Sequence, residues 1–131
     1  MVRNLVLILT ALIFFGCGSD DNSNCDGCGD YILSDTSVQI LIHKTGGFSP
    51  VDETYNYTIP ELSDSSYAML TTIRVKNSDL ECWADAYVYK ITITDENNNT
   101  NDYYSNNAAC GDVDGKNFID TLEIEELISL F

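Results

Sequence analysis

The stretch AYVYKITIT, residues 86–94, is the clearest strand signal in this 131-residue chain. Its residues alternate between an apolar face and a more polar one, with Tyr87, Tyr89, Ile91 and Ile93 on the first and Lys90, Thr92 and Thr94 on the second. Successive side chains of a strand point to opposite faces, so this pattern predicts a strand with one face in the core. The Asn-rich segment 95–100 has turn chemistry, and we expect 101–107 to return as the partner strand.

Four cysteines follow the N-terminal region that ends at Cys17, and in an exported chain they predict two disulfides out of three possible pairings. The hairpin just described would bring Cys82 and Cys110 within one bulge of facing each other, so we expect these two to pair. Such a bridge contributes about 3 kcal/mol to stability. Cys25 and Cys28 would form the second bridge. Their CxxC lies in a Gly/Asp loop, whereas a redox motif opens a helix and a zinc site needs a second close pair of ligands.

A second hairpin is predicted earlier in the chain. Segments 37–44 (SVQILIHK) and 53–59 (ETYNYTI) both have strand composition, and a Gly-Gly-Phe-Ser-Pro break separates them. Paired glycines permit positive φ, which a tight loop requires. The apolar Phe48 in this loop is either tucked under it as a plug or presented to a partner. The plug is the commoner arrangement and is our expectation.

Two helices are expected. Segment 67–73 mixes helical spacing with β-branched residues and is interpreted as a short helix through about Ile73, capped by Ser63 or Asp64. A C-terminal helix from Leu122 onwards would bury a stripe formed by Ile124, Leu127, Ile128 and Phe131. We therefore predict an α+β fold with a small antiparallel sheet of about four strands, in two hairpins, and both helices on one face.

The acidic segment before that helix allows two interpretations. On a twelve-residue EF-hand loop, four acidic residues fall on ligand positions, namely Asp112, Asp114, Asp120 and Glu123. The segment also resembles one half of a dockerin repeat, and these residues are candidate calcium ligands. Against this, Lys116 occupies a ligand position and Asn117 replaces the turn glycine. The alternative is an acidic loop leading into a helix capped by Asp120 or Thr121.

The N terminus resembles the signal peptide of a bacterial lipoprotein. An uncharged apolar run, 5–15, is too short to cross a bilayer as a helix but fits a secretory signal. Gly16-Cys17 at its end resembles a lipobox, which implies cleavage before Cys17 and acylation of that cysteine. The acidic pair after Cys17 resembles the signal that sends Bacteroidota lipoproteins to the outer face of the outer membrane. We therefore expect a membrane-anchored, surface-exposed outer-membrane lipoprotein.

This interpretation divides the chain into a signal peptide at 1–16, the lipidated cysteine with a flexible tether at 17–30, and one α+β domain at 31–131. Cleavage removes one of six basic residues, leaving five against 21 acidic residues and a net charge near −16. Such a chain repels phosphate backbones, so nucleic-acid binding is not expected. The charge suits a cationic partner or divalent cations.

The order of the predicted elements resembles that of emfourin-like proteins, which inhibit thermolysin-like zinc metallopeptidases. The matching segments are 40–48, 55–59, 89–95 and 122–130. The resemblance implies a protein-binding role, and it suggests a candidate partner-binding loop formed by Gly46, Gly47, Phe48 and Ser49.

Three functions follow from these patterns. The first is a binding lipoprotein with a peptidase-inhibitor-like domain. The second is a non-inhibitory surface accessory or assembly lipoprotein of an outer-membrane complex, and the third is a calcium-binding surface module. An enzyme is not expected, because the chain offers a single histidine, His43, without a nucleophile motif or a phosphate loop. No cofactor is expected apart from calcium in the third case.

Overall fold

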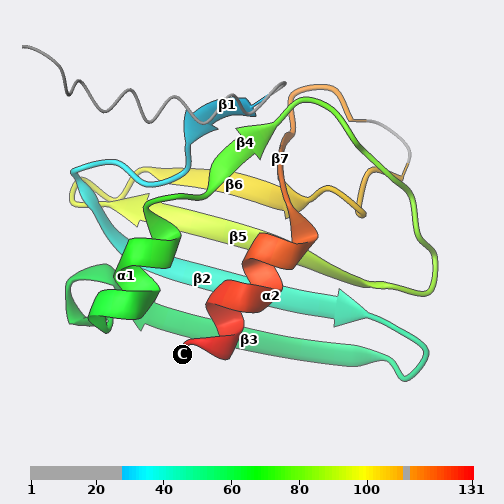
Figure 1. Cartoon of the computed structure of the whole chain (residues 1–131), viewed down its shortest axis with the longest axis horizontal. Helices are drawn as coiled ribbons and strands as arrows, with labels where there is room; N and C mark the ends of the chain where they lie inside the picture. The colour runs from blue at the N-terminus through cyan, green and yellow to red at the C-terminus, as the bar shows by residue number, and fades with distance from the viewer. Residues whose placement is uncertain (1–27, 111–112) are drawn as a thin grey trace, which may run out of the picture.

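The structure is a computed structural model in which residues 28–110 and 113–131 are described. In these residues, seven strands form one sheet in the order β1-β4-β7-β6-β5-β2-β3 (Figure 1). The strands are β1 (Cys28–Tyr31), β2 (Ser37–Gly46), β3 (Val51–Thr58), β4 (Arg74–Lys76), β5 (Tyr87–Asp95), β6 (Thr100–Ser105) and β7 (Asn117–Ile119). The helices are η1 (Ile59–Glu61, 3-10), α1 (Asp64–Leu70) and α2 (Thr121–Ser129).

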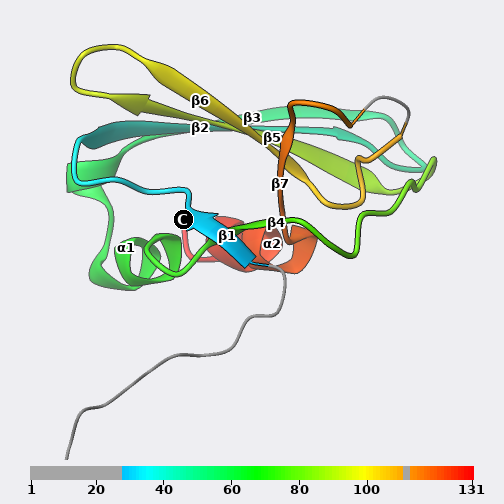
Figure 2. The same ribbon diagram turned by 90° about the horizontal axis from the view of Figure 1, so that it is seen from above.

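Figure 2 shows that both α-helices lie on the same side of the sheet. The long strands β3, β2, β5 and β6 form one layer, and β7 descends from it towards β4 and β1, which lie at the level of the helices. Neither helix has the length and apolar character that a membrane crossing requires, within the part of the chain that the structure describes.

The core lies between the central strands and the helices. Its fully buried apolar side chains come from β2, β5, β7, both α-helices and the link between α1 and β4: Ile40, Ile42, Ile91, Ile119, Leu70, Ile124, Leu127 and Ile73. Burying one such side chain contributes roughly 1.5–3 kcal/mol. The period-two pattern of β5 is thus confirmed, since Tyr89, Ile91 and Ile93 all belong to this core.

Both predicted hairpins are present. Strand β2 pairs antiparallel with β3 from Gln39↔Thr58 to Gly46↔Val51, and β5 pairs antiparallel with β6. The C-terminal helix begins after Asp120, whose side chain accepts a hydrogen bond from the backbone N–H of Leu122. The apolar stripe predicted for this helix packs on the core: Ile124 and Leu127 belong to the core, and Ile128 and Phe131 pack against it. The N-cap of α1 is Ser63, one of the two residues expected there.

The prediction of a four-stranded antiparallel sheet is wrong in two respects. The sheet has seven strands in the described residues, and it is mixed, because β6 and β7 are parallel. The three unpredicted strands, β1, β4 and β7, are only three or four residues long. So few residues carry no recognisable period, and their extended conformation depends on their neighbours in the fold.

The short helix also ends earlier than expected, at Leu70 instead of Ile73. The hydroxyl groups of Thr71 and Thr72 donate to carbonyl oxygens three residues back, at 2.7 Å each. These bonds satisfy carbonyls that the end of a helix leaves free. The chain then turns, and Arg74–Lys76 enters the sheet as β4.

Candidate functional site

The candidate partner-binding loop is the turn between β2 and β3, which we call the hairpin tip: Gly46, Gly47, Phe48 and Ser49. The two glycines have φ values of +91° and +87°. These values lie in the left-handed region, which side chains with a Cβ atom disfavour. The sequence pattern Gly-Gly is therefore a backbone requirement of this turn.

The start of β5 supports the hairpin tip from one side. The backbone N–H of Gly47 donates to the carbonyl oxygen of Ala86 at 3.2 Å. A Cβ atom on Gly46 would lie 2.7 Å from that same oxygen, and one on Gly47 would lie 2.4 Å from the ring of Tyr87. Both glycines thus allow an approach that no other residue permits without a shift of the chain.

Lys44 braces the base of the hairpin tip. Its Nζ lies 4.2 Å from the centre of the Tyr87 ring and 3.6 Å from a carboxylate oxygen of Glu53. A cation over an aromatic ring at a partly exposed site contributes about 0.5–1 kcal/mol. Lys44 therefore links β2, β3 and β5 just below the turn.

Phe48 is presented to solvent, so the expectation of a plug is wrong. Its side chain is 92% exposed, which is the highest value among the large apolar residues described as exposed. The ring of Tyr87 and the backbone of Ala86 pack against the two glycines of the turn, so the turn is covered on that side by the start of β5 and not by Phe48.

A cavity of about 260 Å³ lies beside this base, between β2, β5 and α2. It is lined by Lys44, Tyr87, Tyr89, Glu125, Ile128 and Ser129. The hydroxyl group of Tyr89 donates to Glu125 at 3.1 Å. Burial, followed by the charge of Glu125, raises the pKa of Tyr89 above the ordinary value of 10.0 for a tyrosine. A larger cavity of about 410 Å³ lies elsewhere, beside α1, and contains none of the predicted site residues.

The predicted bridge between Cys82 and Cys110 is confirmed. Their Cα atoms lie 4.8 Å apart, across a sequence separation of 28. The bridge adjoins a short ladder in which the N–H of Glu81 donates to the oxygen of Asn106 at 2.9 Å. It therefore fastens the long segment that leads from β4 into Tyr87. Cys28 is also disulfide-bonded, and its expected partner Cys25 lies outside the described residues, as does the lipidation site Cys17.

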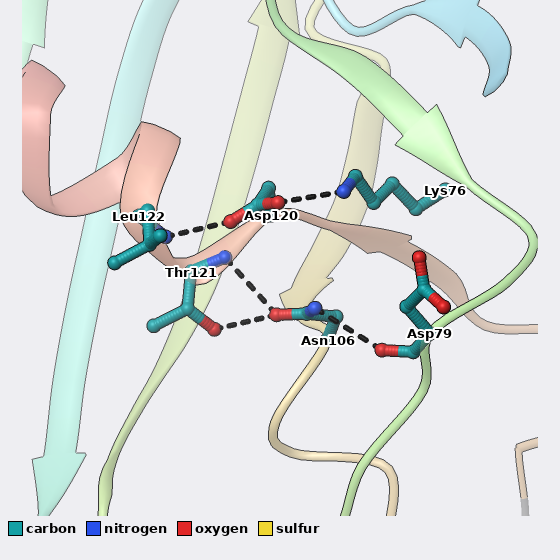
Figure 3. A network of polar contacts seen from close by, with 6 residues as sticks. All are labelled: Lys76, Asp79, Asn106, Asp120, Thr121 and Leu122. Atoms are coloured by element: carbon teal, nitrogen blue, oxygen red, sulfur yellow. Dashed lines mark hydrogen bonds and ion pairs between the residues drawn. The ribbon is translucent and has the colours of Figure 1, made fainter. Parts of the chain in front are cut away.

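Of the four candidate calcium ligands, Asp120 and Glu123 interact electrostatically with each other and with Lys76. Asp112 lies outside the described residues, and Asp120 belongs to a polar network at the start of α2 (Figure 3). One carboxylate oxygen of Asp120 accepts from Lys76 at 2.6 Å, and the other accepts from the N–H of Leu122 at 2.8 Å. The described residues contain no group of three or more His, Cys, Asp or Glu arranged to hold a metal ion. Calcium binding by Asp112, Asp114, Asp120 and Glu123 stays a prediction.

Asn106 completes the network. Its side-chain oxygen accepts from both the N–H and the hydroxyl group of Thr121, at 3.0 and 2.7 Å, and its amide nitrogen donates to the carbonyl of Asp79 at 3.2 Å (Figure 3). The end of β6, the loop after β4 and the start of α2 are thereby joined. Burial alone would raise the pKa of Asp120, but hydrogen bonds from Lys76 and Leu122 outweigh it, and the pKa lies below its ordinary value.

Replacing Asp120 by asparagine separates its two roles. Asparagine caps helices as well as aspartate does, so the cap is kept while the ion pair with Lys76 is lost. The depressed pKa means that this carboxylate adds stability above its ordinary pKa of 3.8, and that this stability is lost as the pH falls through the folded-state pKa. We expect Asp120→Asn to cost about 1 kcal/mol at neutral pH and to flatten the decline in stability between about pH 5 and 2.

Urea unfolding at a series of pH values, followed by circular dichroism, measures this effect. Glu96→Gln, in the exposed turn between β5 and β6, is the matched control for the loss of one carboxylate at the surface. If the stability of the wild type and of Asp120→Asn declined in parallel with falling pH, the stabilising role given to the Asp120 carboxylate would be contradicted.

The sequence predicts the hairpin tip but not the residues that contact and support it, which are Lys44, Ala86 and Tyr87. These residues lie about forty positions apart in the chain, and only the pairing of β2 with β5 brings them together. The paired glycines were the available signal, because they indicate a close approach by another part of the molecule. No protein-family model matches this chain, and no curated protein or solved structure matches it either.

Proposed function

We propose that this protein is a binding lipoprotein, held outside the cytoplasm by a lipid on Cys17, that contacts a protein partner through its hairpin tip. The observation that carries the proposal is the 92% exposure of Phe48 on a turn supported from behind by Tyr87. An exposed aromatic residue is costly to keep in water and is a typical anchor of a protein interface.

The geometry of the tip favours binding. Two positive-φ glycines, the bond from Gly47 to Ala86 and the Lys44 brace hold the turn before any partner arrives. Association costs free energy for every loop that must be ordered, and a supported turn avoids much of that cost. Phe48 can therefore insert into an apolar pocket of a partner with little further loss of entropy.

The resemblance to emfourin-like proteins suggests the class of partner, a thermolysin-like zinc metallopeptidase. In this proposal the tip enters the peptidase cleft and blocks access of substrate. The large negative charge of the mature chain adds attraction towards a cleft with positive potential, including one that contains a metal ion. The Cys82–Cys110 bridge supports an oxidising compartment, where such a peptidase would be met.

Inhibition of a purified thermolysin-like peptidase by the purified domain, residues 17–131 with Cys17 replaced by serine, tests this proposal. We expect a dose-dependent loss of peptidase activity against a folded protein substrate and against a short peptide. A matched measurement uses a serine peptidase, which should keep its activity. Full activity of the metallopeptidase at a large molar excess of the domain would end the inhibitory proposal. Specific retention of an outer-membrane complex by the tip would then favour the accessory role.

A further inference from the structure

Strand β3 forms one edge of the sheet, and no other strand of the described residues lies on its outer side (Figure 1). It is eight residues long and pairs with β2 without a bulge. A long, regular edge presents a row of unpaired backbone N–H and C=O groups, which is a template for another strand.

Hydrogen bonds of β5 show which backbone groups of β3 face outwards. The backbone N–H groups of Tyr89 and Asp95 donate on the β6 side of β5, to Ser105 and Asn99, and along a strand the bonding direction alternates from residue to residue. The even-numbered residues of β5 therefore face β2, where the register His43↔Lys90 pairs them with odd-numbered residues. The odd-numbered residues of β2 therefore bond to β5 and the even-numbered ones to β3. Through the register Ile42↔Tyr55 and Ile40↔Tyr57, the tyrosines bond to β2. The outward N–H and C=O groups belong to Asp52, Thr54, Asn56 and Thr58.

The two edges of the sheet differ in their protection. The opposite edge, β1, has four residues and an irregular register with β4. Edge strands are usually blunted by such shortness, by bulges, by proline or by charged side chains. Segment 54–58 of β3 (TYNYT) has none of these features. Its outward residues Thr54, Asn56 and Thr58 are exposed.

We propose that β3 is a docking edge for an extended segment of a protein partner, which adds to the sheet as an eighth, antiparallel strand. This surface is distinct from the hairpin tip and does not depend on the peptidase proposal. Backbone hydrogen bonds to Thr54, Asn56 and Thr58 supply the binding, as in other cases of strand addition.

The side chains on the two faces of β3 indicate which residue types the added partner strand should carry. On the core side, Tyr55 and Tyr57 are half-buried, and the Tyr57 ring stacks on Phe131 with the ring centres 3.8 Å apart. Alternate apolar residues of the segment would extend this face. On the other side, Thr54 and Asn56 favour polar residues. The acidic start of β3, where the Asp52 side chain is 82% exposed, favours basic residues at the C-terminal end of an antiparallel segment.

The net negative charge of this chain favours a segment of a different protein over a second copy of this chain as the added strand. The mature chain carries 21 acidic residues against five basic ones, so two copies have a net electrostatic repulsion. The basic side chains near this edge are also engaged, since Lys44 lies near Glu53, and His43 contacts Asp52 at 2.7 Å. A basic, alternating segment meets no such repulsion.

A capped seven-residue peptide of alternating threonine and valine, ending in two lysines, is a suitable probe. Added to isotope-labelled domain 17–131 carrying Cys17→Ser, it should slow hydrogen exchange of the amides of Thr54, Asn56 and Thr58 at least tenfold. The same peptide with N-methyl groups on alternate residues along its bonding edge should give no protection. Added salt should weaken the binding of the unmodified peptide.

Thr54→Pro removes one outward N–H while the bonds to β2 remain, and Thr54→Ala is its matched control. We expect the proline variant to bind the peptide at least tenfold more weakly and the alanine variant to bind it like the wild type. Absence of protection at peptide saturation, or equal binding of the N-methylated peptide, would overturn the proposal. Protection of the same amides in a dimer without peptide would assign the edge to a second copy and would also overturn it. Since Phe48 is not involved, Phe48→Ala should bind the peptide normally, which separates this result from that of the hairpin tip.

Discussion

Replacing Cys82 and Cys110 together by alanine is expected to lower the free energy of unfolding by about 3 kcal/mol. The bridge closes a loop with a sequence separation of 28, and its removal frees that loop in the unfolded chain. For a domain of this size the loss corresponds to a fall in melting temperature of roughly 15 °C. Thermal unfolding followed by circular dichroism measures it.

The double variant is a cleaner test than a reducing agent, because Cys28 is also disulfide-bonded and a reductant would break both bridges. The single variant Cys82→Ala, with Cys110 alkylated, also lacks the bridge and serves as a second test of its removal. An unchanged melting temperature in the double variant would show that the segment before β5 is held by its backbone bonds alone. The role given to the bridge would then be wrong.

Replacing Phe48 by alanine is expected to weaken binding of the partner by about 2 kcal/mol or more, which is roughly a thirtyfold rise in the dissociation constant. The reason is that Phe48 is the largest apolar side chain of the hairpin tip, and almost all of its surface is exposed and available for contact with a partner. The melting temperature should change little, since the side chain is 92% exposed in the free protein.

Inhibition constants for the peptidase measure this change. Phe48→Leu keeps an apolar side chain and should lose less than Phe48→Ala, and Ser49→Ala should behave like the wild type. Equal inhibition by the wild type and Phe48→Ala would mean that the tip is not the contact. A matching fall in melting temperature would mean that Phe48 is structural.

The long strands were predictable because each carries its own signal. In β5, the alternation is visible along the strand, and three of the four side chains assigned to the inner face, Tyr89, Ile91 and Ile93, are buried, whereas Tyr87 at the start of the strand is exposed. The register of the β5–β6 hairpin also placed Cys82 close enough to Cys110 to predict their bridge. The helix α2 was predictable for the same reason, since its apolar stripe and its N-cap Asp120 are local features.

The remaining strands could not be predicted from local patterns. Strand β7 has three residues, and both Phe118 and Ile119 in it are buried, so it has no alternation. Its extended conformation comes from pairing with β6 and with β4, and β4 lies about forty residues earlier in the sequence. The acidic segment around β7 predicts either a calcium-binding loop or an acidic loop that leads into the helix, and neither interpretation includes a strand.

The exposure of Phe48 was mispredicted for a similar reason. An apolar residue between glycines and a proline usually finds cover beneath its own loop. Here Tyr87 packs against the glycines of the turn, and nothing near Phe48 in the sequence signals its presence. Contacts between segments that are distant in the sequence therefore determine both the formation of the short strands and the exposure of Phe48 at the candidate site.

Photo-cross-linking from position 48 tests the central claim most directly. A light-activated phenylalanine analogue replaces Phe48 in the full-length protein, expressed in its own cells. A second variant carries the analogue in place of Asn98, in the turn at the opposite end of β5 (Figure 1). We predict that light yields a cross-linked metallopeptidase from position 48 and not from position 98. Equal cross-linking from both positions, or a partner captured only from position 98, would contradict the assignment of the hairpin tip as the binding site.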